Sequence, residues 1–388
     1  MSDDIKWRQH QNLKSLKLKN KAKYYCDLQN IEHSWSGRMD CSYGNTFIME
    51  SEQLLINAIE LFEMGYFDCA YYSLRSAIDI SITMVFLSDI PDKDNYLKDW
   101  EQIKPFPLRK VIIDKLKEDG TIFVDMLKKM PTFFIQAKKL NEQLNKYVHK
   151  QGLDNFYVFR NHPIMQDKSQ DAFINNFETY LKKCISVIAV MRLAIDPFPI
   201  LLMDEDILYR CFDSMTNPYT DEFVNEYIGI TILQEYKNTD FYSSIRQLFK
   251  NEEKKNYDVF NIVKNRYIKT QKFDNIFKQI HLLNGEDLIC TSIAYICEKA
   301  VKIYACDGLL VYNTDRKSNR ESLSLNTQDF VEFQNTQNKL NQKYDKTFIS
   351  VFQFNKDFYF VEHNVELTFE DYSKTINYIE DVLNKLEK

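Results

Sequence analysis

Glycine and proline are scarce in this sequence, which contains only 8 of each among its 388 residues. β-Sandwiches and dinucleotide-binding sheets need many tight turns, and these two residues supply the backbone angles that such turns require. Their scarcity therefore argues against both fold classes and favours long helices. Apolar residues make up 44% of the chain and aromatic residues 14%, which is enough to build full hydrophobic cores. The length predicts two or three domains.

Net positive charge, paired cysteines and long apolar runs are also missing. The formal net charge of −6 excludes a global basic field that would draw the chain onto nucleic acid. The eight cysteines include no Cys-x-x-Cys pair and no zinc-like spacing with histidine, so we predict free thiols and no metal or other cofactor. The first residues lack the apolar segment of a signal peptide, and the longest apolar run, residues 78–87, is far below the ~20 residues of a membrane span. We therefore expect a cytoplasmic protein without a membrane partner.

The first half of the chain has the hydrophobic periodicity of a helical bundle. Apolar residues recur at intervals of three and four, which places them on one face of each helix. The predicted helices cover residues 50–63, residues 67–85, the stretch from Pro107 to Gly120, the stretch from Pro131 to Gly152, and residues 171–193. Pro197 and Pro199 then mark the clearest break in the chain. We assign residues 1–45 to an N-terminal arm or helix and residues 46–196 to the bundle.

The second half changes character along its length. Residues 200–280 are predicted to be helical, and residues 281–388 to form a small lobe of mixed helix and strand. The predicted order in this lobe is α-β-β-α-β-β-α, which occurs in many sensor and dimerisation modules and identifies none of them alone. The fold class is therefore mainly α, with a helical bundle, a helical segment and a C-terminal α+β lobe.

Two hairpins and a capped helix define the predicted lobe. Asp307-Gly308 between two apolar runs is the strongest short hairpin signal in the sequence. Thr368 and Asp371 have the spacing of a capping box at the start of the last helix. The other predicted elements are helices over about 287–301 and 327–343 and a second hairpin formed by residues 348–354 and 358–367.

Two segments of the first half together resemble a known family. Residues 65–79 read GYFDCAYYSLRSAID, and residues 144–149 read LNKYVH at the end of the fourth predicted helix. They resemble the early paired helices and the later signature helix of the HEPN superfamily, and more narrowly its bacterial members from defence and toxin loci. The resemblance covers residues 46–195. It implies a helical bundle that forms a homodimer, and it leaves open a protein partner from the same operon and RNA.

Active members of this family cut RNA without a metal, using an arginine and a histidine separated by four to six residues. His149 matches the histidine, but the arginine would have to stand at position 142, 143 or 144. Those positions hold Glu142, Gln143 and Leu144, and a carboxylate repels phosphate. On the helical wheel His149 lies on the polar side together with Asn145 and Glu142.

Three residues are therefore the candidate catalytic residues: His149, Asn145 and Arg75. His149 would exchange a proton with the ribose hydroxyl or the leaving oxygen, and Arg75 would supply a cation from another helix. The alternatives stay open at this point. A histidine in the last turn can instead interact with the helix dipole or serve an interface, and Arg75 can form an ordinary ion pair.

We therefore hypothesise a non-catalytic HEPN-like interaction or sensor component of a bacterial defence or toxin-related system. The alternative is a metal-independent endoribonuclease that uses His149. Weaker signals are the basic residues within 1–30, the basic and aromatic stretch 250–278, and His162 in a predicted loop. Each basic stretch is either a solvated face or a surface that contacts nucleic acid.

Overall fold

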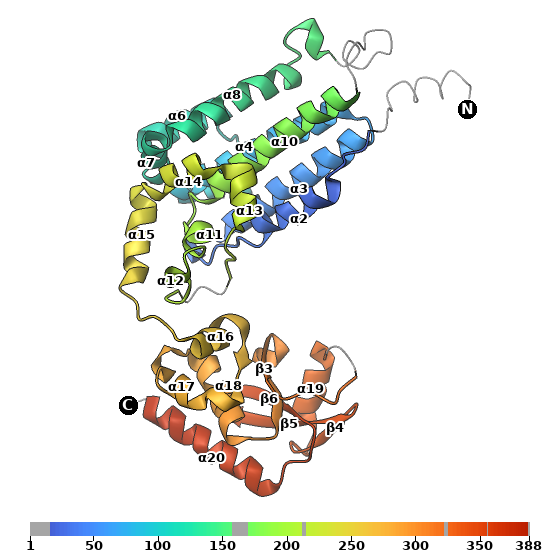
Figure 1. Cartoon of the computed structure of the whole chain (residues 1–388), viewed down its shortest axis with the longest axis vertical. Helices are drawn as coiled ribbons and strands as arrows, with labels where there is room; N and C mark the ends of the chain where they lie inside the picture. Colours follow the sequence, from blue (N-terminus) through green and yellow to red (C-terminus); the bar gives the residue numbers. More distant parts are fainter. Residues whose placement is uncertain (1–15, 157–169, 212–214, 322–324, 355, 387–388) are drawn as a thin grey trace, which may run out of the picture. The chain divides into compact units, whose positions relative to one another are not determined.

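The computed structural model in Figure 1 describes residues 16–156, 170–211, 215–321, 325–354 and 356–386. It divides the chain into two compact units, one up to Glu252 and the other from Glu253 onward. The first unit is helical, and the second combines helices with one six-stranded sheet. This confirms the predicted fold class, a mainly α chain with a small α+β lobe.

The first unit is built around long helices that pack along one another. These are α2 (Lys21–Glu32), α3 (Tyr43–Glu63), α4 (Phe67–Asp89), α8 (Pro131–Val148) and α10 (Gln170–Arg192) (Figure 1). Three shorter helices, α5 (Lys93–Glu101), α6 (Arg109–Asp119) and α7 (Ile122–Lys129), connect α4 to α8. All five predicted helices are present, and α2 lies within residues 1–45, which were assigned to an arm or helix, whereas α5 and α7 were not predicted.

Stacked aromatic rings form the centre of this bundle. The rings of Phe62 and Phe177 are stacked with their centroids 3.9 Å apart, and Phe62 also contacts Phe67 and Phe173. Phe62 and Phe177 are fully buried. A large aromatic side chain contributes roughly 1.5–3 kcal/mol when it leaves water, so these rings fix how α3, α4 and α10 pack.

Residues 200–252 belong to the first unit, and residues 253–280 belong to the second. The sequence had suggested instead that residues 200–280 form one separate helical segment. Their elements are α11 (Phe198–Leu201), α12 (Glu205–Leu208), α13 (Asp221–Phe223), a π-helical turn, η4 (Val224–Ile228), α14 (Ile230–Lys237) and α15 (Asp240–Lys250). Tyr219, Phe223 and Tyr236 are buried in the same core as α3 and α10. Short helices with one apolar stripe cannot bury it alone, so they pack onto the bundle.

The second unit is a sheet with helices packed on both faces, and it begins at Glu253 rather than at the predicted residue 281. Its elements are α16 (Tyr257–Asn265), β1 (Tyr267–Ile268), α17 (Phe273–Phe277), α18 (Gly285–Ile296), β2 (Ala300–Ala305), β3 (Leu310–Thr314), α19 (Thr327–Asn335), β4 (Gln342–Tyr344), β5 (Thr347–Phe354), β6 (Asp357–His363) and α20 (Phe369–Leu386). The strand order is β1-β3-β2-β6-β5-β4, and only the β1–β3 pair is parallel.

Alternating side chains along each strand bury both faces of the sheet. Ile303 and Val361 belong to the core on the side of α18 and α20, and Tyr304 and Phe360 belong to the core under α19. Both predicted hairpins are present, as β2–β3 and β5–β6. The predicted helix 327–343 is shorter than expected, because β4 takes its last residues into the sheet beside β5.

The turn of the first hairpin requires glycine. Asp307 and Gly308 have φ angles of 52° and 87°, in the left-handed region. A Cβ atom added at Gly308 would lie 2.2 Å from Cε2 of Phe330 in α19. The turn is therefore held against α19 as closely as a backbone without a side chain allows.

Candidate functional site

The end of α8 presents the predicted histidine to solvent. Pro131 begins the helix at a position where its missing N–H costs nothing, and His149 is the residue that ends it. The backbone N–H of His149 donates to the carbonyl of Asn145 over 2.8 Å. Lys150 and Gly152 follow with positive φ angles, which stops the helix. The side chain of His149 is exposed.

Two of the three predicted site residues lie in contact. Arg75 of α4 donates through Nε to Oδ1 of Asn145 in α8 over 3.0 Å, although the two are 70 residues apart. Arg75 also forms an ion pair with Asp79, one turn further along α4. In the described part of the chain, no hydrogen bond or ion pair joins the side chain of His149 to either Arg75 or Asn145.

A second arginine completes this polar cluster. Arg109, at the start of α6, contacts the same Oδ1 atom of Asp79 at 2.5 Å. Two guanidinium groups thus share one carboxylate oxygen. Burial, together with the charge of Arg75, lowers the pKa of Arg109 to about 10. An ordinary ion pair of Arg75 was one of the alternatives left open by the sequence, but no local pattern could predict that Arg109 reaches the same carboxylate.

The cation that follows His149 is also engaged. Lys150 forms an ion pair with Asp68 of α4, and its ammonium lies 5.6 Å from the centre of the Tyr72 ring. Arg75 of α4 and Lys150, the residue after His149, are therefore both held in contacts between α4 and the end of α8. The contacts that tie α8 to α4 use the groups that a ribonuclease would direct at phosphate.

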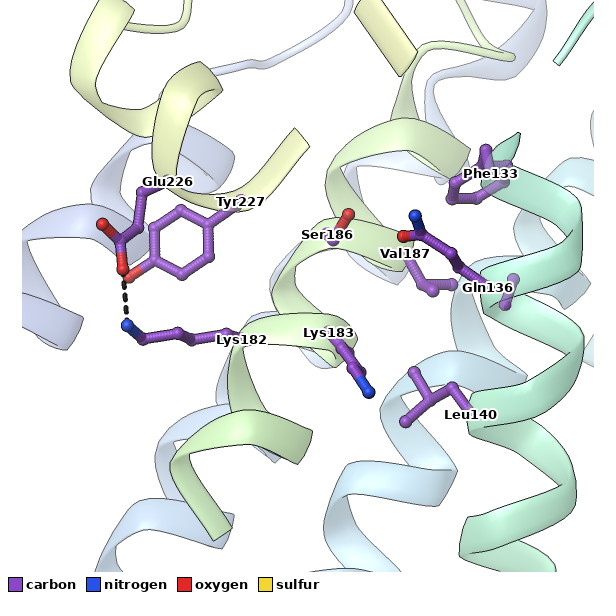
Figure 2. A pocket seen from close by; sticks show the side chains of 10 residues that line it. Phe133, Gln136, Leu140, Lys182, Lys183, Ser186, Val187, Glu226 and Tyr227 are labelled. Carbon is purple, nitrogen blue, oxygen red and sulfur yellow. Dashed lines mark hydrogen bonds and ion pairs between the residues drawn. The ribbon is translucent and has the colours of Figure 1, made fainter. Parts of the chain in front are cut away.

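A cavity opens between α8, α10 and the π-turn η4, and sequence reasoning did not predict it. Its volume is about 110 Å³, and Figure 2 shows the side chains that line it. The lining residues are Phe133, Gln136, Ala137, Leu140, Lys182, Lys183, Ser186, Val187, Glu226 and Tyr227. Phe133, Ala137 and Leu140 carry the apolar periodicity of α8, but only the packing of three separate segments turns part of that stripe into a cavity.

The second unit contains a buried serine–histidine pair that is structural. Ser350 and His363 are 2.8 Å apart, and Nδ1 of His363 lies 3.0 Å from the carbonyl oxygen of Val365. Both side chains are completely buried, so no substrate could reach the hydroxyl. Burial lowers the pKa of His363 to about 4, which keeps the imidazole neutral.

Other features of the described residues bear on function as follows. No group of three or more His, Cys, Asp or Glu side chains in the described ranges could hold a metal ion. No helix in that part of the chain is both long and apolar enough to cross a membrane. His162 and residues 1–15, with the first basic residues of the N-terminal arm, lie outside the described residues.

Comparison of the chain with protein-family models, with curated proteins and with solved structures finds no match in any of the three.

Proposed function

We propose that the first unit is a non-catalytic HEPN-like interaction or sensor module of a bacterial defence or toxin-related system, and that it acts in the cytoplasm as a homodimer. The observation that carries this proposal is the engagement of Arg75, which is bound to Asn145 and Asp79 and makes no described contact with His149. The resemblance of residues 65–79 and 144–149 supports the choice of family and, through it, the defence role and the dimer.

The chemistry of RNA cleavage explains why this engagement matters. A histidine that moves a proton and a guanidinium that stabilises the phosphorane must reach the same phosphate, and small misplacements cost orders of magnitude in rate. Arg75 would have to release Asn145 and Asp79 to serve that role. Only about 13% of its side chain is exposed, so release would also require α8 to shift away from α4.

A second candidate function is a metal-independent endoribonuclease that uses His149. Two observations favour it. Asn145, which Arg75 contacts, lies one helical turn before His149. Residues 109–150 also carry ten lysines and arginines against five aspartates and glutamates in a chain of net charge −6. Such a local excess of positive charge would attract RNA whether or not it is cut.

Incubation of the purified full chain with mixed RNA in chelator separates the two functions. The parent is compared with His149→Ala, and Lys139→Met serves as the control because Lys139 is an exposed lysine of the same helix. The proposal expects no cleavage by any of the three proteins. Cleavage by the parent and the control, but not by His149→Ala, would overturn it in favour of the endoribonuclease.

The dimer is tested separately by light scattering after size-exclusion chromatography. The proposal expects the mass of two chains at micromolar concentration. A mass of one chain, 46.3 kDa, over the whole concentration range would contradict the homodimer.

A further inference from the structure

The cavity beside α8 is lined by five apolar or aromatic residues and by five polar or charged ones. Phe133 and Leu140 of α8 are buried, Val187 of α10 is buried, and Tyr227 of η4 is almost fully buried. Figure 2 shows the amide of Gln136 directed from α8 toward Ser186 and Val187 of α10. Sites for small organic ligands combine apolar surface with polar groups that fix the orientation of the ligand.

The two lysines at the cavity differ in whether a carboxylate pairs with the ammonium group. Lys182 pairs with Glu226 of η4 at 2.5 Å, so its charge is neutralised within the cavity wall. Lys183, in contrast, has no hydrogen bond or ion pair with any described residue. Figure 2 shows its side chain extending toward Leu140 of α8, on the opposite side from Lys182. The cavity therefore presents one unmatched positive charge beside its apolar walls.

The size of the cavity limits what can enter. Its volume of about 110 Å³ is well below the roughly 300–1,000 Å³ of pockets that take drug-sized ligands. It approaches the ~150 Å³ of an engineered protein cavity that binds benzene. One six-membered ring fits these dimensions.

We infer that this cavity binds a small aromatic anion, a single ring that carries one carboxylate, and that this ligand is what the module senses. The ring would lie beside Leu140 of α8 and Val187 of α10, and the carboxylate would bind the ammonium of Lys183, which Figure 2 shows extending toward Leu140. This inference rests on the sensor function proposed above and gives that sensor its ligand class.

The same cavity is connected to the N-terminal helix of the unit. The hydroxyl of Tyr227 donates to Oδ2 of Asp27 in α2 over 2.5 Å, and the ammonium of Lys23 lies 5.6 Å from its ring. The π-turn that carries Tyr227 ends at Gly229, whose φ is 82°. Such turns interrupt regular helix geometry and are frequent at functional sites. Tyr227 therefore joins the wall of the cavity to α2.

Saturation-transfer NMR with benzoate tests the inference on the full chain. A ligand of this size binds weakly, so a Kd on the order of 1 mM is expected for the parent. Benzamide has the same shape without the charge and should bind about tenfold more weakly, since charge-assisted hydrogen bonds are the stronger ones. Lys183→Met should weaken benzoate about tenfold and leave benzamide unchanged.

Three further variants make each outcome decisive. Lys139→Met removes an exposed charge from α8 outside the cavity and should bind benzoate like the parent. Ala137→Met fills the cavity from α8 and should abolish binding of both compounds while the circular dichroism spectrum stays helical. Lys183→Gln replaces Lys183→Met if the latter does not fold.

The inference is overturned if the parent shows no saturation transfer from benzoate at 20 mM, roughly twenty times the expected Kd. Equal affinity of parent and Lys183→Met, or of benzoate and benzamide, also overturns it. Failure here would leave the RNA experiment unchanged, because the cavity and His149 are altered by different variants. Cleavage that depends on His149 would in turn reject the non-catalytic function without altering the benzoate result.

Discussion

Both units bury an arginine–carboxylate pair, but each unit satisfies it differently. In the helical unit, Arg192 at the end of α10 pairs with Asp196 at 3.2 Å and donates to the backbone carbonyl of Ser34 over 2.6 Å. In the sheet unit, Glu362 of β6 accepts from the hydroxyl of Tyr304 over 2.7 Å, and Arg320 lies 3.6 Å away. All four charged side chains are at most 3% exposed.

The difference follows from where free backbone groups occur. A helix end and the loop beside it offer carbonyls that have no partner in the helix ladder, so a buried arginine can use them. On the face of a sheet the strands have already used these groups, so the buried carboxylate depends on side chains. In the helical unit, Arg192 thus links the end of α10 to the distant segment around Ser34. In the sheet unit, Arg320 and Glu362 link a loop to the central strands β2 and β6.

The largest effect is expected for Arg192→Met. This change leaves Asp196 buried and unpaired and should cost roughly 3–5 kcal/mol of unfolding free energy. All three tryptophans precede Glu252, so tryptophan fluorescence in urea reports on the first unit alone. Lys104→Met breaks an exposed pair with Asp99 and should cost less than about 1 kcal/mol. Similar losses for both variants would show that the buried pair stabilises the first unit no more than an exposed pair does.

Gly308→Ala should give the next largest effect, and only in the sheet unit. Its Cβ would clash with Phe330 and its φ is positive, so a loss of about 1–3 kcal/mol is expected. Gly285→Ala is the matched control, because nothing lies within 4 Å of the added Cβ in α18. Hydrogen exchange of residues 300–335 should increase only in Gly308→Ala. Unchanged exchange would mean that the turn can move away from α19.

Acid should shift the stability of the two units in opposite directions. Burial, with the nearby charge of Glu32, raises the pKa of Glu52 in α3 from 4.5 to about 7, so the folded first unit binds the proton more tightly and loses stability as pH rises from 4.5 to 7. Burial lowers the pKa of His363 from 6.5 to about 4, so the second unit loses stability as pH falls from 6.5 to 4.

Two variants isolate these contributions. Glu52→Gln should flatten the pH dependence of the fluorescence midpoint in urea, and His363→Asn should flatten that of hydrogen exchange in β5 and β6. Parallel pH responses of the two units in the parent, unchanged by either variant, would remove this contrast.

The smallest effect is expected for His149→Ala. His149 is exposed at the end of α8, and a side chain at such a position contributes at most about 0.3–1 kcal/mol through the helix dipole. Urea unfolding followed by tryptophan fluorescence should show a loss of no more than this. A loss above 2 kcal/mol would mean that His149 packs against other groups, and the variant would no longer isolate chemistry.

Local signals predicted most of the fold. The periodicity of α4 and α10, the Asp307-Gly308 turn and the Thr368–Asp371 capping box each lie within a few residues, and the structure contains all of them. β1 was missed because its two residues form a strand only by pairing with β3, more than forty positions away. Such pairing has no periodicity of its own.

The site was predicted only in part for the same reason. The polar side of α8 placed His149 outward, as the helical pattern implied, whereas Asn145 on the same predicted side is half-buried against Arg75 of α4. The contact of Arg75 with Asn145 and the approach of Arg109 depend on how α4, α6 and α8 pack, which no single stretch of sequence encodes.

The parallel strand β1 has a practical consequence for dissecting the molecule. Val259, Ile262, Ile268 and Ile276 are fully buried in the core of the sheet unit. A fragment cut at residue 281 would expose the apolar surfaces that these side chains cover and would leave β3 as a bare edge, inviting aggregation. An expression fragment that starts at residue 253 keeps this apolar layer and the protected edge. The two-residue strand β1 therefore decides where a fragment for expressing the sheet unit should begin.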